Sequence, residues 1–371
     1  MYRLAFASLV ALAACAPQRG GGRQRATAQQ QAAQVPQGVS QAADGSMILD
    51  ATANVNQLPI RFKIAAPADQ FTAASGVPGA AAAGGANGTM GVNVLLHGDG
   101  GQSFFDFPNQ NVQANTMGVA LLAPDPNLFW GGGSGLDRTD GVAHAQAVSD
   151  FVTTMMPQLV AFDANNVKFT GVSGGSLLMS GFFIPAQMQN FANSAVELNC
   201  GAMPPQVDFQ NQAAVMSTLR MHYQSTQSEL QLLQGSIPQA ITTYEQAAAA
   251  AGLTADQINA LQTVDNTPQG GHCEFDGQDF VSGVQTMLTS YSNVVQGGNG
   301  VVTGLGAPSD GNVLRGVVGN ENLQFTGGKK RSVGAEEMVV KRWTESLEKR
   351  QDILVEEEGV AMLACDRTKC N

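Results

Sequence analysis

Residues 167–178 read Val-Lys-Phe-Thr-Gly-Val-Ser-Gly-Gly-Ser-Leu-Leu. A short apolar run leads into a Gly-x-Ser-x-Gly pattern centred on Ser173, and a second apolar run follows it. This order predicts a buried strand, a sharp turn and a helix. So tight a turn needs residues with little or no side chain on both sides of the serine, because the backbone passes close to its neighbours there. We interpret the stretch as a nucleophile elbow that raises the Ser173 hydroxyl above a sheet edge, rather than as a glycine-rich loop with an incidental serine.

Apolar runs of strand length alternate with helically spaced segments on both sides of this elbow. Besides the elbow strand, the predicted strands cover residues 58–65, 90–96, 117–123, 194–198, 215–224 and 261–265. The predicted helices cover residues 140–156, 174–191, 237–251 and 280–294. The first strand alternates apolar and polar residues and is expected at a sheet edge, whereas 90–96 and 117–123 are compact apolar runs, as in a parallel sheet covered on both faces. The alternation predicts an α/β fold with a doubly wound, mostly parallel sheet rather than a sandwich.

The N-terminal segment predicts export from the cell. Residues 1–16 hold one basic residue, an apolar run too short to span a bilayer, and the small residues Ala-Cys-Ala at the end, which is typical of a secretory signal peptide. An alternative is a bacterial lipoprotein signal, which would make Cys15 a lipid-bearing anchor. Residues 17–45 are rich in Gln, Ala, Gly and Arg without an apolar period, so we expect a disordered spacer before a folded domain at 46–296.

The C-terminal segment, residues 297–371, is glycine-rich at first and then charged. It contains the basic pairs Lys341-Arg342 and Lys349-Arg350, which processing proteases of the secretory pathway cut. Such pairs also occur by chance in charged helices, so cleavage of this tail is left open. The pairs favour a eukaryotic secreted protein.

Composition excludes some partners. The chain of 371 residues has a formal net charge of −11, which repels nucleic-acid phosphates. No later stretch is long and apolar enough to form a stable membrane span. No metal-ligand cluster or phosphate loop stands out, so we expect no cofactor and no metal, and we expect a monomer.

The cysteines predict disulfides. Without Cys15 four remain, an even number suited to an oxidising compartment, and four cysteines allow three pairings. We favour Cys200 with Cys273 in the folded domain and Cys365 with Cys370 in the tail.

Ser173 needs a general base, and the chain has four histidines. Three fall within or next to predicted strands and helices, namely His97, His144 and His222. Only His272 lies in a loop after the last predicted strand, where a sheet presents groups beyond its C-terminal edge. A neutral imidazole there can accept the serine proton and return it to a leaving group. The alternative is a loop histidine merely held in place by its neighbour Cys273.

Residues 97–101, His-Gly-Asp-Gly-Gly, directly follow a predicted buried strand. A glycine-rich turn at that place directs backbone N–H groups toward one point, as an oxyanion requires. We predict Gly174 as one donor and Asp99 or Gly100 as the other. The side chain of His97 is expected to pack or to hydrogen-bond rather than to react.

The acid that would orient His272 is less clear in the sequence. Residues 225–230 read Ser-Thr-Gln-Ser-Glu-Leu, and Glu229 is the only carboxylate there. Thr226 and Glu229 also have the spacing of a helix capping box, which is a purely structural use. Asp208 is the rival. We favour Glu229, because the orienting role requires only a carboxylate within reach.

Taken together, the His-Gly-Asp-Gly-Gly, Gly-Val-Ser-Gly-Gly and Gly-Gly-His motifs resemble α/β-hydrolase serine esterases. The resemblance is to the secreted poly(3-hydroxybutyrate) depolymerase and feruloyl or acetylxylan esterase type, and it covers residues 58–296. Parts of the chain are also similar to secreted fungal proteins labelled "cyclin-like F-box", although neither module is visible here. The resemblance implies Ser173 as nucleophile, His272 as base, and Asp99 with Gly174 as oxyanion donors. The family's usual aspartate is absent.

These observations predict a secreted serine ester hydrolase that works through an acyl-enzyme. Its expected substrate is a small carboxylic ester or one linked to a polysaccharide or polyester. The alternative is a non-catalytic protein of the same fold that binds a polysaccharide or cell-wall polymer, motivated by the missing aspartate and the Gly/Asn-rich loops. Trp130, in one such loop, suits either stacking on a sugar or aromatic acid or burial in the core.

Overall fold

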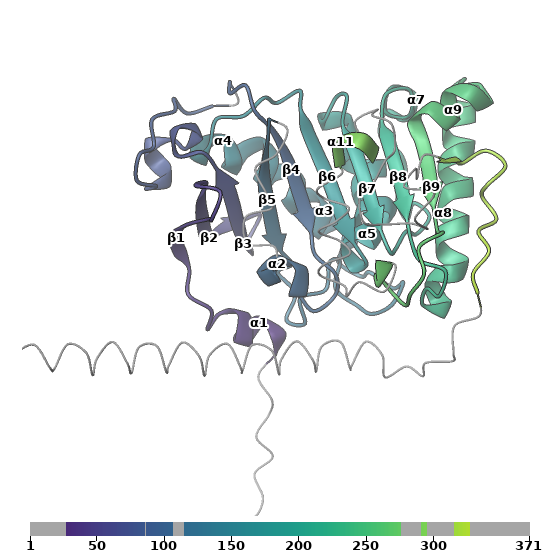
Figure 1. The fold of residues 1–371 in the computed structure, drawn as a ribbon, viewed down its shortest axis with the longest axis horizontal. Helices are drawn as coiled ribbons and strands as arrows, with labels where there is room; N and C mark the ends of the chain where they lie inside the picture. Colours follow the sequence, from purple (N-terminus) through teal and green to yellow (C-terminus); the bar gives the residue numbers. More distant parts are fainter. Residues whose placement is uncertain (1–26, 86, 107–114, 276–290, 295–314, 327–371) are drawn as a thin grey trace, which may run out of the picture.

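The computed structural model describes residues 27–85, 87–106, 115–275, 291–294 and 315–326 (Figure 1). Outside these residues lie the signal segment with Cys15, most of the predicted helix 280–294, both basic pairs, and Cys365 with Cys370. Within the described part, one ten-stranded sheet has the order β1-β2-β3-β5-β4-β6-β7-β8-β9-β10.

The strands and their bounds are β1 (Gly38–Gln41), β2 (Met47–Val55), β3 (Leu58–Ala66), β4 (Gly91–Leu96), β5 (Thr116–Leu122), β6 (Val167–Val172), β7 (Ala195–Asn199), β8 (Arg220–Gln224), β9 (Gln262–Asp265) and β10 (Arg315–Gly316). The central strands β5, β4, β6, β7, β8 and β9 are mutually parallel. Antiparallel pairing extends the sheet with β1, β2 and β3 at one side and with β10 at the other. The predicted α/β class with a mostly parallel sheet is therefore confirmed.

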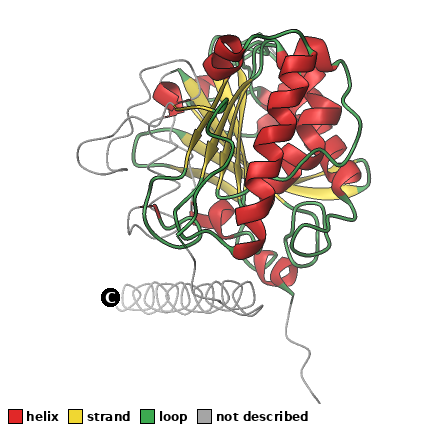
Figure 2. Ribbon diagram, turned by 90° about the vertical axis from the view of Figure 1, so that its right-hand side faces the viewer, coloured by secondary structure: helices red, strands yellow, loops and turns green. Residues whose placement is uncertain are grey.

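The α-helices are α1 (Ala28–Ala32), α2 (Gln102–Asp106), α3 (Gly141–Asp150), α4 (Met156–Leu159), α5 (Gly174–Leu178), α6 (Ile184–Gln187), α7 (Gln212–Met216), α8 (Gln231–Ala250), α9 (Ala255–Leu261) and α11 (Tyr291–Val294). π-Helical turns at Phe151–Met155 and Met179–Phe183 join α3 to α4 and α5 to α6. Single 3₁₀ turns occupy Ala68–Gln70, Ala73–Ser75 and Met188–Asn190. In Figure 2 the long helices, α8 foremost, cover one face of the sheet.

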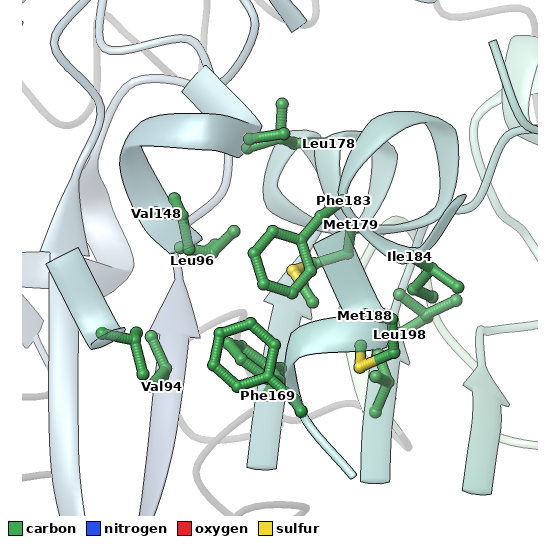
Figure 3. Close-up of a cluster of buried hydrophobic side chains, with 14 of the residues drawn as sticks. Val94, Leu96, Val148, Phe169, Leu178, Met179, Phe183, Ile184, Met188 and Leu198 are labelled. Carbon is green, nitrogen blue, oxygen red and sulfur yellow. The ribbon is translucent and has the colours of Figure 1, made fainter. Parts of the chain in front are cut away.

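Both faces of the central strands are buried, which explains their compact apolar runs. On the face covered by α3, α5 and α8, alternate strand residues such as Val94, Phe169 and Leu198 meet helical residues such as Val148 and Phe183 (Figure 3). The intervening strand residues Leu95, Ala120 and Val172 point to the opposite face and join a second cluster with Phe104 and Phe105. Core packing thus holds the sheet on both faces, and loops follow the carboxyl ends of its strands.

The predicted spacer at 17–45 is wrong for its described part. α1 and β1 form there, although the composition is polar. The reason is a buried arginine from β3. Arg61 donates from Nη1 to the Ala32 carbonyl at 2.6 Å and from Nη2 to the Pro36 carbonyl at 3.2 Å, and it pairs with both carboxylate oxygens of Asp50 at 2.8 Å. These backbone carbonyls bind the cation, and Ala28 and Ala32 of α1 are buried in the second hydrophobic cluster.

Two other predictions for the sheet differ from the structure. β3 lies inside the sheet rather than at its edge, because β1 and β2 extend the sheet beyond it. Residues 215–224 are not one strand, since α7 ends at Met216 and β8 starts at Arg220. The predicted strand therefore joined buried residues of two different elements, the end of α7 and β8.

The folded domain also extends past the predicted limit at residue 296. β10 pairs with β9, and the Thr326 N–H donates to the Gln227 carbonyl at 2.9 Å. A two-residue strand that adds to a sheet edge through backbone bonds leaves no side-chain pattern to detect.

Glu197 of β7 is a fully buried carboxyl in the second face of the sheet. It lies in register between Thr170 and His222. Burial raises its pKa to about 7. The folded chain therefore keeps Glu197 protonated between pH 4.5 and 7, where the unfolded chain releases the proton.

Stability is expected to fall as pH rises through this interval. Glutamine at position 197 removes the titration, so the free energy of unfolding of the wild type should drop relative to Glu197→Gln by up to about 3 kcal/mol between pH 5 and 8. Burial lowers the pKa of His97 to about 4, so the contribution of His97 to stability is lost as pH falls, opposite to that of Glu197. Both proteins contain His97, so the difference between them isolates the effect of Glu197. Urea unfolding at several pH values measures the difference, and parallel curves would contradict the expectation.

Candidate active site

The strand order identifies where a site belongs. β4 lies between β5 and β6, and the chain leaves β4 toward one side of the sheet but leaves β6 toward the other. Loops that depart in opposite directions from neighbouring parallel strands open a crevice at their carboxyl ends. Residues 97–101 follow β4 and Ser173 follows β6, so two of the predicted motifs meet at this point.

The turn at Ser173 has the backbone of a nucleophile elbow. Ser173 has φ 49° and ψ −112°, a strained conformation for a residue with a side chain. A Cβ on Gly175 would lie 2.1 Å from the Leu96 carbonyl oxygen, and one on Gly171 would lie 2.6 Å from the Ser176 Cα, so both positions require glycine. The Ser173 N–H donates to the Asn199 carbonyl at 2.8 Å, which ties the elbow to β7. The half-buried serine thus stands between β6 and α5, as the sequence predicted.

Three side chains form a hydrogen-bonded chain at this edge. His272 Nε2 lies 2.9 Å from Ser173 Oγ, and His272 Nδ1 is hydrogen-bonded to Glu229 Oε1. A carboxylate can only accept, so Nδ1 carries the proton and Nε2 presents its lone pair to the serine. The Glu229 side chain is fully buried and that of His272 is 17 % exposed. The structure therefore brings together the three residues favoured from the sequence, from positions 43 and 99 residues apart along the chain.

Glu229 does not act in a capping box with Thr226. The Thr226 hydroxyl donates instead to the carbonyl of Gly271 at 2.8 Å, directly before His272. Glu229 Oε1 also accepts the N–H of Leu230 at 2.7 Å, which fixes the carboxylate. Asp208, the rival acid, is exposed in the loop between β7 and α7. Sequence reasoning missed the contribution of Thr226, because the same spacing suits a helix cap.

A disulfide holds the other side of His272. Cys273 is bonded to Cys200 with a Cα–Cα distance of 5.4 Å, the pairing predicted for the folded domain. Cys200 directly follows β7, and its neighbour Gly201 lies against the elbow, since a Cβ there would approach the Ser173 carbonyl oxygen to 2.9 Å. The bridge thus joins the histidine loop to the strand beside the serine. Among the described residues, Cys200, His272 and Cys273 also form the group with metal-ligand geometry, but the disulfide occupies both sulfurs.

The predicted oxyanion donors are the backbone N–H groups of Asp99 and Gly174, next to Ser173. Within the 97–101 turn the N–H of Gly100 donates to Leu128 at 3.2 Å and that of Gly101 to Gly98 at 3.0 Å. The hydrogen bonds of the described residues leave the N–H of Asp99 without an acceptor. Gly174 is the first residue of α5, so its N–H has no acceptor within the helix. Of the two predicted alternatives, Asp99 rather than Gly100 retains a donor for an oxyanion.

Gly174→Ala is expected to disturb this pair of donors. A Cβ at position 174 would lie 1.9 Å from Asp99 Oδ1, so the 97–101 turn would have to move. We expect kcat for an activated ester to fall by about 10²-fold, the usual loss for one displaced oxyanion donor. Gly235→Ala is the matched control, because a Cβ in that part of α8 meets nothing within 4 Å. Equal kcat in both variants would contradict the expectation.

The other histidines are structural. His97 is fully buried, donates from Nδ1 to the Gly98 carbonyl at 2.6 Å and accepts the Ala123 N–H at 2.9 Å through Nε2. His144 Nδ1 accepts the N–H of Gly131 at 2.8 Å. His222 is buried in β8 and is hydrogen-bonded to neighbouring strand residues. Trp130 is fully buried with its ring 5.5 Å from that of His97, so it belongs to the core and cannot stack on a ligand.

The sheet, the strand–serine–helix elbow and the chain order of serine, carboxylate and histidine are those of an α/β-hydrolase fold. No protein-family profile and no curated protein matches the chain. Among solved structures it is similar to a thermostable esterase, with 13 % identity and a TM-score of 0.46 over 67 % of this chain and 61 % of the esterase. It is also similar to fungal esterases from Rhizomucor miehei (12 % identity, TM-score 0.42, 73 % of this chain and 88 % of theirs) and to a ferulic acid esterase (13 %, 0.41, 68 % and 98 %). The chain thus spans less than two thirds of the thermostable esterase.

In the part of the chain that the structure describes, every helix is too short or too polar to cross a membrane.

Proposed function

We propose that this protein is a serine ester hydrolase that works through an acyl-enzyme, with Ser173 as nucleophile, His272 as general base and Glu229 as the acid that orients the histidine. The observation that carries the proposal is the hydrogen-bonded chain from Ser173 through His272 to Glu229 beside two open backbone N–H groups. A hydroxyl, an imidazole whose tautomer is set by a carboxylate, and a pair of donors are the parts that acyl transfer requires.

Each residue has a defined task in the reaction. His272 Nε2 takes the proton of Ser173 as Oγ attacks the ester carbonyl, and the carbonyl oxygen becomes an oxyanion held by the N–H groups of Asp99 and Gly174. The tetrahedral intermediate collapses, and His272 returns the proton to the departing alcohol. Water then enters, gives a proton to His272 and attacks the acyl-enzyme, which releases the carboxylic acid and restores Ser173. The Glu229 carboxylate stabilises the imidazolium that forms twice in the cycle.

The finer features of the proposal are the setting and the substrate. We propose action outside the cell, supported by the signal-like residues 1–16 and by a disulfide next to the catalytic histidine. The half-buried hydroxyl at the sheet edge suits a carboxylic ester of a small alcohol or of a polysaccharide or polyester chain. The non-catalytic alternative depended on a missing acid, and a buried glutamate bonded to His272 removes that reason.

A fluorophosphonate probe tests the reaction class directly. The native protein should react with it, and mass spectrometry of the digest should find the adduct on Ser173. Heat-denatured protein serves as the control, because an unassembled serine is not nucleophilic. The same preparation should hydrolyse p-nitrophenyl acetate and butyrate, and acetylated xylan, methyl ferulate and poly(3-hydroxybutyrate) then distinguish the substrate classes. A folded protein that shows neither an adduct nor ester turnover would falsify the proposal.

A further inference from the structure

Asp99 presents a difficulty for the proposed reaction. Its backbone N–H is one of the two open donors, but its carboxylate lies in the same place, against the elbow. A Cβ added to Gly174 would lie 1.9 Å from Asp99 Oδ1. The side chain is only 14 % exposed, so water screens it poorly. An unpaired negative charge here would oppose the negative charge that develops on the substrate oxygen.

Arg138 meets that carboxylate with both arms of its guanidinium. Nη1 donates to Asp99 Oδ1 at 2.8 Å and Nη2 donates to Oδ2 at 2.7 Å. The Arg138 side chain is 1 % exposed. Two parallel bonds fix the angle of the carboxylate as well as its position, which a lysine, with a single point charge, does not do.

The arginine is itself held by the loop that follows β5. Nη1 also donates to the Trp130 carbonyl at 3.2 Å, and a Cβ on Gly131 would lie 2.8 Å from the Arg138 Cβ. Trp130 is fully buried between the rings of His97 and His144. The guanidinium therefore ties the 97–101 turn to a rigid, packed part of the core.

We propose that Arg138 is a positioning residue for the oxyanion site. It holds the Asp99 backbone so that its N–H faces the substrate oxygen, and it neutralises the Asp99 carboxylate beside that oxygen. The inference rests on the proposed function, because it assigns a role within the same reaction. It adds a residue that touches neither the substrate nor the triad and acts only through Asp99.

A pair of charges that work together gives a distinctive pattern of variants. Arg138→Gln leaves the Asp99 carboxylate buried and uncompensated, which is the costly way to break such a pair. The double variant Asp99→Asn with Arg138→Gln contains no charge, and its amides can still bond to each other. A purely structural contact would make the double variant as poor as the single one or poorer, whereas charge neutralisation makes it better.

The test measures kcat and KM for p-nitrophenyl acetate in the wild type, Arg138→Gln, Arg138→Lys and the double variant. We expect kcat of Arg138→Gln to fall by about 10²-fold with KM changed by less than roughly threefold, since one oxyanion donor is lost. The lysine variant should be intermediate, and the double variant should regain about tenfold or more over Arg138→Gln. Affinity for a trifluoromethyl ketone, which forms an oxyanion adduct with a nucleophilic serine, should fall in parallel with kcat/KM.

Circular dichroism and thermal unfolding of each variant separate loss of fold from loss of positioning. Wild-type kcat in folded Arg138→Gln would overturn the inference, and so would a folded double variant no more active than Arg138→Gln. In both cases the wild type remains active and its fluorophosphonate adduct on Ser173 remains, so the proposed function stands. An inert, unlabelled wild type would instead overturn both.

Discussion

Ser173→Ala is expected to lower kcat for an activated ester by roughly 10⁴-fold or more, because no other group can form the acyl-enzyme. The residual rate should be small but above that of water, since the N–H groups of Asp99 and Gly174 still polarise a bound ester. KM should change little, as the hydroxyl contributes mainly to the transition state.

The measurement is steady-state hydrolysis of p-nitrophenyl butyrate, together with loss of fluorophosphonate labelling. Ser217→Ala is the matched control, because that serine is exposed at the end of α7, far along the chain from the elbow. Its activity should equal that of the wild type. If Ser173→Ala keeps more than a tenth of wild-type kcat, the covalent mechanism is wrong.

Glu229→Gln is expected to lower kcat by about 10³- to 10⁴-fold while the protein stays folded. Glutamine has nearly the same shape, but it carries no charge, and its amide can donate to Nδ1 of His272. The imidazole would then carry its proton on Nε2, where it cannot accept the proton of Ser173.

The control for this variant is Asp208→Asn, which removes the other carboxylate considered from the sequence. Asp208 is exposed, so its loss should change kcat by less than about twofold, as is usual for a surface position. Kinetics of both variants on one substrate decide between the two acids. A large loss in Asp208→Asn with normal activity in Glu229→Gln would reverse the assignment.

The sequence predicted the parts of the fold that depend on local pattern. Residues 167–178 carry their strand, turn and helix in consecutive positions, and the apolar runs before and after them specify buried parallel strands. His272 could be selected because only four histidines exist and three fall in or beside regular elements. Glu229 was favoured as the acid because orienting the histidine requires only a carboxylate within reach.

What the sequence could not predict depends on contacts between distant residues. Arg138 reaches Asp99 across 39 positions, and nothing near Arg138 marks it as a partner of the 97–101 turn. Likewise α1 forms from a largely polar segment, held by the hydrogen bond of Arg61 to the Ala32 carbonyl and by the burial of Ala28 and Ala32. β10 adds to the sheet edge by backbone bonds alone. In each case a contact with a distant residue, either a side-chain bond or backbone pairing, decides the structure where the local sequence does not.

The bridge between Cys200 and Cys273 makes catalytic competence depend on the history of the chain. Its two ends come from positions 73 residues apart: Cys273 adjoins the proposed base His272, and Cys200 lies beside the elbow of the proposed nucleophile Ser173. A molecule that matured in a reducing compartment would contain every atom of the proposed triad but lack the covalent bond between the histidine loop and the segment after β7. Specific activity would then report how much of a preparation had been oxidised, independently of how much protein it contained.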